Sequence, residues 1–477
     1  MARSHFFFVA LILASLIAGG CGGGGGGGAT PPTPPPPPPP VEIGRGPGPA
    51  ADAIPAEPAI NTMAARNAPM ASAPDAALVR PAVLDRMDCF ASSPPASTAE
   101  LQALLDDFTG WVTQQPNDAA AQAGLATALL LAGAYNAGID AGYTPAQLLG
   151  LLEPVTQIAS LKHRGGLFAA AESWMARYTL PRQLAAICQL TPAQDFPNPS
   201  DPDFSTADLQ IGVRRFLLPM IPLARARLQA VGNGAASATA PLVQFGPETN
   251  RLVVYRAEVH ALIGISRLIE AWLLQACAYQ FNGGDWDWNV QMRALDDDGD
   301  GLLTVAEYLP PDPFLWRHQS TNMRDAGAEI ERALTALIAG VDATRAGSLL
   351  ERALGETTAA AEKARLSDLL EMTRGQLSVT LLYAGGTTSA GSRSAQMNLS
   401  RLWSAPPDDI KDLMPTLELA SGSAWQALPR GASDFPDPTL GGIFPQPAPL
   451  MEILSGGPAW LAVSYGAVDE LTIFDRR

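Results

Sequence analysis

Residues 296–307, with the sequence DDDGDGLLTVAE, constrain this chain more than any other stretch, because they place oxygen atoms at regular intervals along one short segment. Gly301 lies in the middle, where a sharp turn lets the chain bend around an ion. A hard dication such as Ca²⁺ binds roughly six to eight oxygen atoms from carboxylates, carbonyls and water. The spacing therefore predicts a calcium site with these ligands: Asp296, Asp298, Asp300, the main-chain carbonyl of Leu302, a water held by Thr304, and Glu307.

These residues resemble the EF-hand calcium loop, and the resemblance extends at most one helical turn to either side. It implies Ca²⁺ as the bound ion. The flanks differ from those of a regulatory EF-hand, because Pro310 and Pro311 stop the exit helix and no second loop follows. We therefore expect a structural calcium that joins a helix ending near Phe281 to a helix beginning near Ser320. The alternative is an acidic surface loop that matches the pattern by chance.

The N-terminus has the features of an export signal: Arg3 is positive, residues 6–17 are apolar, and small residues precede Cys21. The apolar run is too short to span a bilayer. A small-residue stretch that ends in cysteine resembles the bacterial lipoprotein signal peptide. The resemblance implies removal of residues 1–20 and lipidation of Cys21, which would anchor the protein to a membrane of the cell envelope.

The residue after Cys21 is Gly22 rather than the Asp that resembles an inner-membrane retention signal, so we expect the outer membrane, facing the periplasm or the exterior. The lipoprotein family prefers Leu at the place that Ala18 occupies. An ordinary secretory signal with an incidental cysteine is therefore the alternative.

Residues 21–95 are rich in Gly, Pro and Ala and contain few large apolar side chains. Such a composition buries too little surface to offset the entropy of ordering the chain, which predicts a disordered tether. One apolar patch in this region is expected to dock onto the folded part: Val83, Leu84, Met87, Cys89 and Phe90.

Apolar residues at spacings of three and four begin near Thr98 and recur along most of the remaining chain. They predict an all-α fold, either a multi-helix bundle or an irregular helical-repeat array, with one or two short strands near residues 460–474. We expect helical regions at 96–232 and 242–477, the second of which carries the calcium loop. The longest helix is expected at about 250–281, and it should lie centrally because its apolar residues occupy more than one face.

The first helical region contains a pattern of small and large residues that resembles a tetratricopeptide repeat, a helical hairpin unit. The residues that carry the resemblance are Leu125, Ala126, Leu129, Gly133, Tyr135 and Gly138. Because a stack needs about three repeats for stability, an ordinary helical hairpin is the alternative.

The formal net charge of −16 argues against a nucleic-acid partner, because phosphate backbones are bound through clustered Lys and Arg. Four arginines lie close together in the sequence, and we expect them to form a solvated face paired with carboxylates, an anion site being the alternative: Arg214, Arg215, Arg225 and Arg227. His260 is expected to be a core histidine. Cys277 should be a buried small hydrophobe, although one disulfide among Cys89, Cys188 and Cys277 is compatible with the sequence.

The chain lacks the phosphate-binding GxxxxGK[ST] motif and the catalytic GxSxG and HExxH motifs. The sequence therefore favours a non-catalytic, membrane-anchored envelope protein that binds or scaffolds a protein partner, with calcium in a structural role. The alternative is an envelope enzyme or a solute-binding or transport component of another type.

Overall fold

The fold is mainly helical, as the sequence predicts, and helices account for most of the residues described. The computed structural model describes residues 59–70, 83, 85–86, 98–140, 212–232, 241–245, 252–278, 296, 298–304, 321–346, 348, 350–351, 358–384, 393–406, 417–419, 425–427, 437, 439, 441–446, 460–465 and 468–475. The described residues do not include Cys21, Glu307 or residues 145–190, where the apolar pattern also predicts helices.

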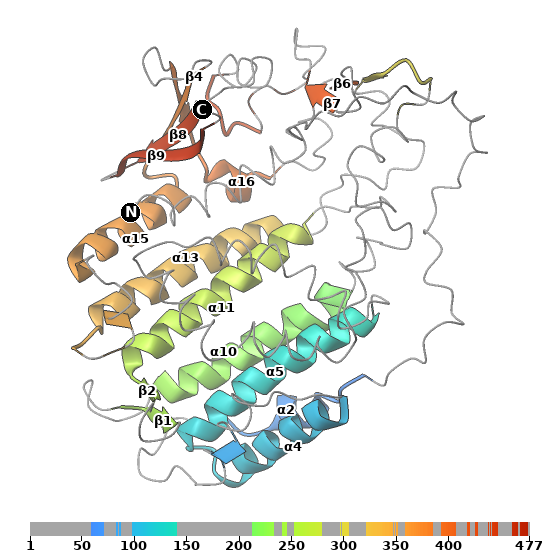
Figure 1. Ribbon diagram of the computed structural model, residues 1–477, viewed down its shortest axis with the longest axis vertical. Coiled ribbons are helices and arrows are strands. Elements are labelled where there is room, and N and C mark those ends of the chain that lie inside the picture. Colours follow the sequence, from blue (N-terminus) through green and yellow to red (C-terminus); the bar gives the residue numbers. More distant parts are fainter. Residues whose placement is uncertain are drawn as a thin grey trace, which may run out of the picture.

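The long helices lie side by side in chain order, each packed against the next, from α4 through α5, α10, α11 and α13 to α15 (Figure 1). None of the described helices combines the length and the apolar character that a membrane span requires. The helices are α2 (Met63–Asn67), α4 (Thr98–Gln114), α5 (Ala119–Asp140), the π-helix η1 (Val213–Leu217) that continues into α10 (Leu218–Gly232), α11 (Arg256–Ala276), α13 (Asn322–Asp342), α15 (Ala359–Thr373) and the short α16 (Arg401–Ser404).

Local sequence explains where several helices begin and which face they bury. Asp118 precedes α5, and its Oδ1 accepts hydrogen bonds from the main-chain N–H groups of Ala120 and Ala121, which have no partner within the helix. Thr358 caps α15 in the same way through its hydroxyl oxygen. In α4 the buried residues recur at helical spacing and form the stripe that faces α5: Leu101, Leu104, Leu105, Phe108 and Val112.

Helix α11 lies between α10 and α13, which confirms its predicted central position. Val259 packs into the core on the α10 side, whereas Ala257 packs into the core on the α13 side. A Cβ atom added to Gly264 would lie 2.6 Å from the Leu337 Cγ on α13, so glycine lets these two helices approach closely. The helix begins at Arg256 rather than near residue 250, because residues 252–254 form a strand.

The two largest hydrophobic cores among the described residues flank this central helix. One contains residues from α4, α5, α10 and the start of α11, and the other contains residues from α11, α13, α15, α16 and two strands. Among the described residues, the first of these cores joins side chains from both helical regions predicted at 96–232 and 242–477, so the two regions pack as one body there.

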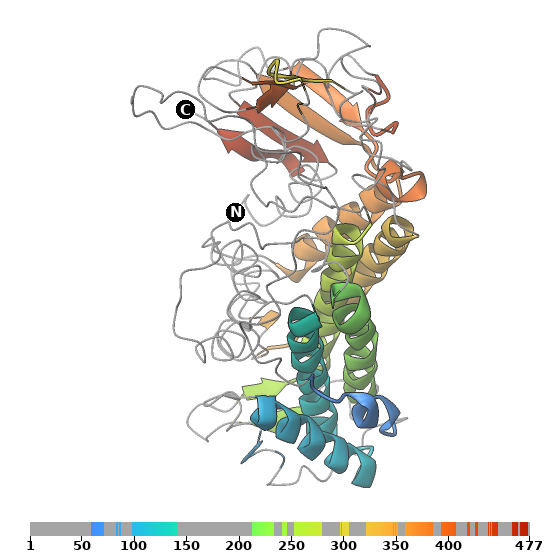
Figure 2. The same cartoon turned by 90° about the vertical axis from the view of Figure 1, so that its right-hand side faces the viewer.

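The strands in the described part of the chain form three antiparallel sheets, and the largest lies at the end of the molecule opposite α4 (Figure 2). The C-terminal strands expected near residues 460–474 are present as β8 and β9, within a sheet of order β5-β4-β8-β9. The strands are β1 (Val243–Phe245), β2 (Leu252–Val254), β3 (Leu302–Leu303), β4 (Val379–Ala384), β5 (Arg393–Met397), β6 (Leu417–Leu419), β7 (Trp425–Ala427), β8 (Trp460–Tyr465) and β9 (Val468–Asp475).

This sheet contains more strands than the all-α prediction allows. The apolar spacing predicts a helix that continues through Leu377 to Leu381, but α15 ends at Thr373 and Leu381 lies on β4. Gly375 explains the difference, because it adopts a positive φ of 72° that a helix interior does not permit. Its N–H donates to the Met372 carbonyl and closes the helix end.

The N-terminal tether prediction is wrong for residues 59–70, which form α2 and its flanks and pack against α4, α5 and α10. The docking expected for Val83 is confirmed, since this side chain is fully buried. Close to it, Arg86 Nε lies 3.2 Å from Asp107 Oδ2 on α4. The folded part of the chain therefore begins well before Thr98.

Candidate metal centre

Asp296, Asp298 and Asp300 come together at one point of the loop that leads into β3. Each offers one carboxylate oxygen, and these oxygens all lie within 4.8 Å of one another. Asp296 is half-buried, whereas Asp298 and Asp300 are exposed. The structure therefore brings together the three aspartates that the sequence pattern selects.

The loop reaches this shape through two glycines and its own carboxylates. Gly299 and Gly301 have φ angles of 70° and 80°, in the left-handed region that glycine adopts most easily. The main-chain N–H of Asp300 donates to Asp298 Oδ1 at 3.1 Å, and that of Leu302 donates to Asp300 Oδ1 at 2.7 Å. These bonds turn the chain so that alternate aspartates face one centre.

The same loop is joined to a distant part of the chain by a short β-sheet. Leu302 pairs with Glu418 and Leu303 pairs with Leu417, so β3 forms the edge of a sheet of order β3-β6-β7. The sequence pattern does not predict this partner, because strands of two and three residues carry no recognisable periodicity. The pairing connects the loop to residues 417–418 through main-chain hydrogen bonds.

The donor set fits a hard cation. Oxygen atoms that bind calcium lie about 2.3–2.6 Å from it, so two of them are separated by at most about 5.2 Å. The spacing of 4.8 Å among the three carboxylate oxygens satisfies this limit. Leu302 and Thr304 follow directly in the chain, with Thr304 exposed, and Glu307 lies outside the described residues. Carboxylates without nitrogen or sulfur ligands favour Ca²⁺ or Mg²⁺ over transition metals.

Comparison of the chain with protein-family models, with curated proteins and with solved structures finds no significant match. A functional interpretation therefore depends on the residues of this chain itself.

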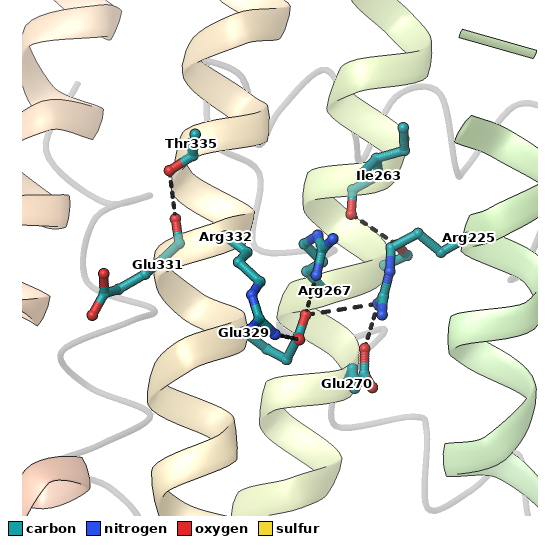
Figure 3. Close-up of polar contacts among 9 residues, drawn as sticks. Arg225, Ile263, Arg267, Glu270, Glu329, Glu331, Arg332 and Thr335 are labelled. Carbon is teal, nitrogen blue, oxygen red and sulfur yellow. Dashed lines mark hydrogen bonds and ion pairs between the residues drawn. The ribbon is translucent and has the colours of Figure 1, made fainter. Parts of the chain in front are cut away.

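A second group of charged residues lies between α10, α11 and α13 (Figure 3). Arg225 on α10 pairs with Glu270 on α11, and Arg267 on α11 pairs with Glu329 on α13. Arg332 also binds Glu329 from one turn further along α13. Except for Arg332, the side chains of this cluster are largely buried. Removal of one partner would therefore leave a buried charge without a counter-charge, which is costly.

The solvated arginine face expected from the sequence is wrong for Arg225 and Arg227, both of which are buried. Periodicity does not reveal this burial, because the acidic partner of Arg225 comes from another helix. Desolvation raises the pKa of Glu270, and the hydrogen bond from Arg225 opposes that rise. We interpret the charged cluster as a device that aligns three helices, since buried ion pairs tolerate few alternative registers.

His260 and Cys277 both lie on or directly after α11, in surroundings that favour their neutral forms. Burial lowers the pKa of His260, and the nearby Arg256 lowers it further. Burial raises the pKa of the Cys277 thiol to about 11, which keeps it protonated at neutral pH. Cys277 is a buried thiol that forms no disulfide, as the apolar pattern around it predicts.

Proposed function

We propose that this protein is a calcium-binding lipoprotein of the cell envelope that acts as a non-catalytic binding or scaffolding protein. Calcium has a structural role in this proposal, and the lipid on Cys21 anchors the chain to the outer membrane. The observation that carries the calcium assignment is the meeting of three aspartate oxygens within 4.8 Å, in the loop whose sequence resembles an EF-hand.

The pairing of β3 with β6 supports a structural role for the ion. In the EF-hand pattern, Leu302 contributes its main-chain carbonyl to the metal, and the same residue pairs with Glu418. An ion that holds Leu302 in place would therefore stabilise the sheet β3-β6-β7. The pairing thus connects the loop to residues 417–418, more than a hundred positions later in the chain.

The binding role is supported by the arrangement of the helices. Helices α4, α5 and α10 lie side by side in chain order, as the helices of helical-repeat proteins do (Figure 1). The anchor is supported by Cys21 and the small residues before it, which resemble a lipoprotein signal. Replacing Cys21 by Ser is expected to release the protein from the membrane fraction, and unchanged partitioning would reject the anchor.

Thermal unfolding of the purified chain with calcium and with a chelator tests the calcium proposal. A ligand at a hundred times its Kd stabilises the folded state by about 2.7 kcal/mol, so calcium should raise the melting temperature measurably. Asp298→Asn and Glu307→Gln should reduce this rise. Asp85→Asn is the matched control because Asp85 is an exposed aspartate outside the loop. Coincident melting curves with calcium and with chelator would reject the proposal.

A further inference from the structure

Residues 59–70, here called the strap, lie across α4, α5 and α10 and are held there through their main chain. The side-chain amide of Asn136 on α5 forms two hydrogen bonds with the main chain of Ile60. The Ile60 N–H donates to Asn136 Oδ1 at 2.7 Å, and Asn136 Nδ2 donates to the Ile60 carbonyl at 2.8 Å. The side-chain amide of Gln102 on α4 binds Asn61 in the same way. The Asn61 N–H donates to Gln102 Oε1 at 2.7 Å, and Gln102 Nε2 donates to the Asn61 carbonyl at 3.3 Å.

Arg227 on α10 holds the other end of the strap. Its Nη1 donates to the Pro69 carbonyl at 2.9 Å, and its Nη2 donates to the carbonyls of Ala65 and Ala68 at 3.1 and 2.9 Å. These acceptors lie at the end of α2 and just after it, where the helix dipole favours a cation. Together with the bonds from Asn136 and Gln102, seven hydrogen bonds join the strap to the helices, and all of them use main-chain atoms of the strap.

Only three strap side chains enter the core: Ile60, Ala65 and Ala68. The others point outward, and Met63 and Met70 are the exposed large apolar residues of the strap, each 59% exposed. The side chains of Gln102, Asn136 and Arg227, here called the groove, therefore contact the main chain of a dipeptide and of the helical turn that follows it. One aliphatic and two small side chains of the strap are buried beside them. Such a site depends little on the remaining sequence of the peptide that fills it.

The strap accepts three hydrogen bonds from Arg227 but has no acidic side chain that would neutralise its charge. The residue is 1% exposed, and its Nε has no hydrogen-bond partner among the described residues. Desolvation lowers the pKa of Arg227, and no acidic side chain of the described residues forms an ion pair with it. A buried cation without a counter-charge is costly, so a ligand that brings a carboxylate to this end would bind more tightly than the strap does.

The position of Pro69 shows which carboxylate fits. The Pro69 carbonyl oxygen lies 2.9 Å from Arg227 Nη1, so in a peptide ending at this position the same oxygen would belong to the terminal carboxylate. The geometry points to a peptide-binding groove that takes the free C-terminal segment of a partner protein and that the strap occupies in cis. This inference deepens the proposed binding role and rests on it, since it names the class of partner.

Fluorescence anisotropy with a labelled peptide tests the groove. The peptide has the sequence of residues 57–69, EPAINTMAARNAP, and is made with a free C-terminal carboxylate or with an amide. The full chain carries Ile60→Asp, which should release the strap because a buried aliphatic residue becomes charged. We expect this chain to bind the carboxylate peptide about tenfold more tightly than the amide, because a charge-assisted bond adds about 1.4 kcal/mol.

Variants in the same Ile60→Asp background separate the two parts of the inference. Asn136→Leu should abolish peptide binding, whereas Arg227→Met should remove the difference between carboxylate and amide. Arg324→Met is the control for the loss of an exposed arginine and should change neither. Equal binding of the two peptides to the Ile60→Asp chain would overturn the assignment of a C-terminal partner.

Hydrogen exchange on the wild-type chain provides a second measurement that needs no strap mutation. Excess unlabelled carboxylate peptide should displace the strap and raise exchange at Ile60 and Asn61, while the amide peptide should do so less. Absence of any change, together with no binding to folded Ile60→Asp protein, would overturn the groove itself. Because the calcium-dependent melt uses other residues, a failed groove and a failed calcium proposal give distinguishable results.

Discussion

Arg225 Nη1 on α10 lies 3.8 Å from Glu329 Oε2 on α13, so these two side chains connect the helices on either side of α11. Glu329 also binds Arg267 and Arg332, which makes it the acidic centre of the charged cluster. Only 9% of its side chain is exposed. Glu329 is therefore the one carboxylate of the cluster that pairs with arginines of all three helices.

Replacing Glu329 by Gln should lower the free energy of unfolding by about 3–5 kcal/mol, because buried arginines lose their counter-charge. Urea denaturation followed by circular dichroism measures this loss. The control is Glu331→Gln on the same helix, where the exposed pair with Arg374, at 2.9 Å, should be worth less than about 1 kcal/mol. Equal effects of the two substitutions would contradict the role assigned to the cluster.

Replacing Gly264 by Ala should destabilise the protein by about 1–3 kcal/mol, because the new Cβ would lie 2.6 Å from Leu337 Cγ and 3.1 Å from the Ala333 carbonyl oxygen. Gly110→Ala is a matched control within α4, since a Cβ there meets nothing within 4 Å. That control should stabilise the helix by about 0.5–1 kcal/mol. Thermal melts of both variants test the close approach of α11 and α13, which a neutral Gly264→Ala would disprove.

Lowering the pH should reduce the free energy of unfolding of the wild-type protein more than that of the His260→Gln variant. Burial and Arg256 lower the pKa of His260 in the folded state, so the unfolded chain binds more protons once the pH falls below the ordinary histidine pKa. The contribution of neutral His260 is present above that value and is lost as the pH falls through the lowered folded-state pKa. Chemical denaturation at a series of pH values from about 7 to about 5 measures the difference. Parallel pH profiles for the two proteins would show that His260 does not titrate in this way.

Removal of calcium should increase hydrogen exchange in β6 as well as in the loop. Leu302 and Leu303 pair with Glu418 and Leu417, so loss of the ion should weaken a sheet far away in sequence. The strands β4 and β8 belong to a separate sheet and provide the internal control. If exchange rises in the loop alone, the ion does not stabilise the sheet β3-β6-β7.

Much of the fold follows from local patterns. The apolar spacing predicts α4, the central α11 and the helix that contains Ile330 and Leu337, because a helix that buries one stripe repeats its apolar residues every three or four positions. The end of α15 is misjudged because apolar residues continue at helical spacing past Gly375. There the positive φ of one glycine outweighs the periodicity.

The sequence predicts the three aspartates of the candidate metal centre, but it does not predict the strand that pairs with the end of their loop. Asp296, Asp298 and Asp300 are close in sequence, so turn geometry alone brings their carboxylates together. The strand that pairs with Leu302 and Leu303 comes from much later in the chain and has no motif of its own. The pairing of β3 with β6 therefore depends on tertiary packing rather than on local sequence.

The sequence by itself determined the helical character, the three aspartates and the resemblance of Cys21 to a lipidation site, because each depends on residues that lie close together in the chain. The tertiary structure alone decided that Arg225 and Arg227 are buried and that residues 59–70 are docked. Both outcomes require groups from distant helices. A composition poor in large apolar residues predicts disorder, but side-chain amides and a guanidinium can hold a main chain whatever its composition.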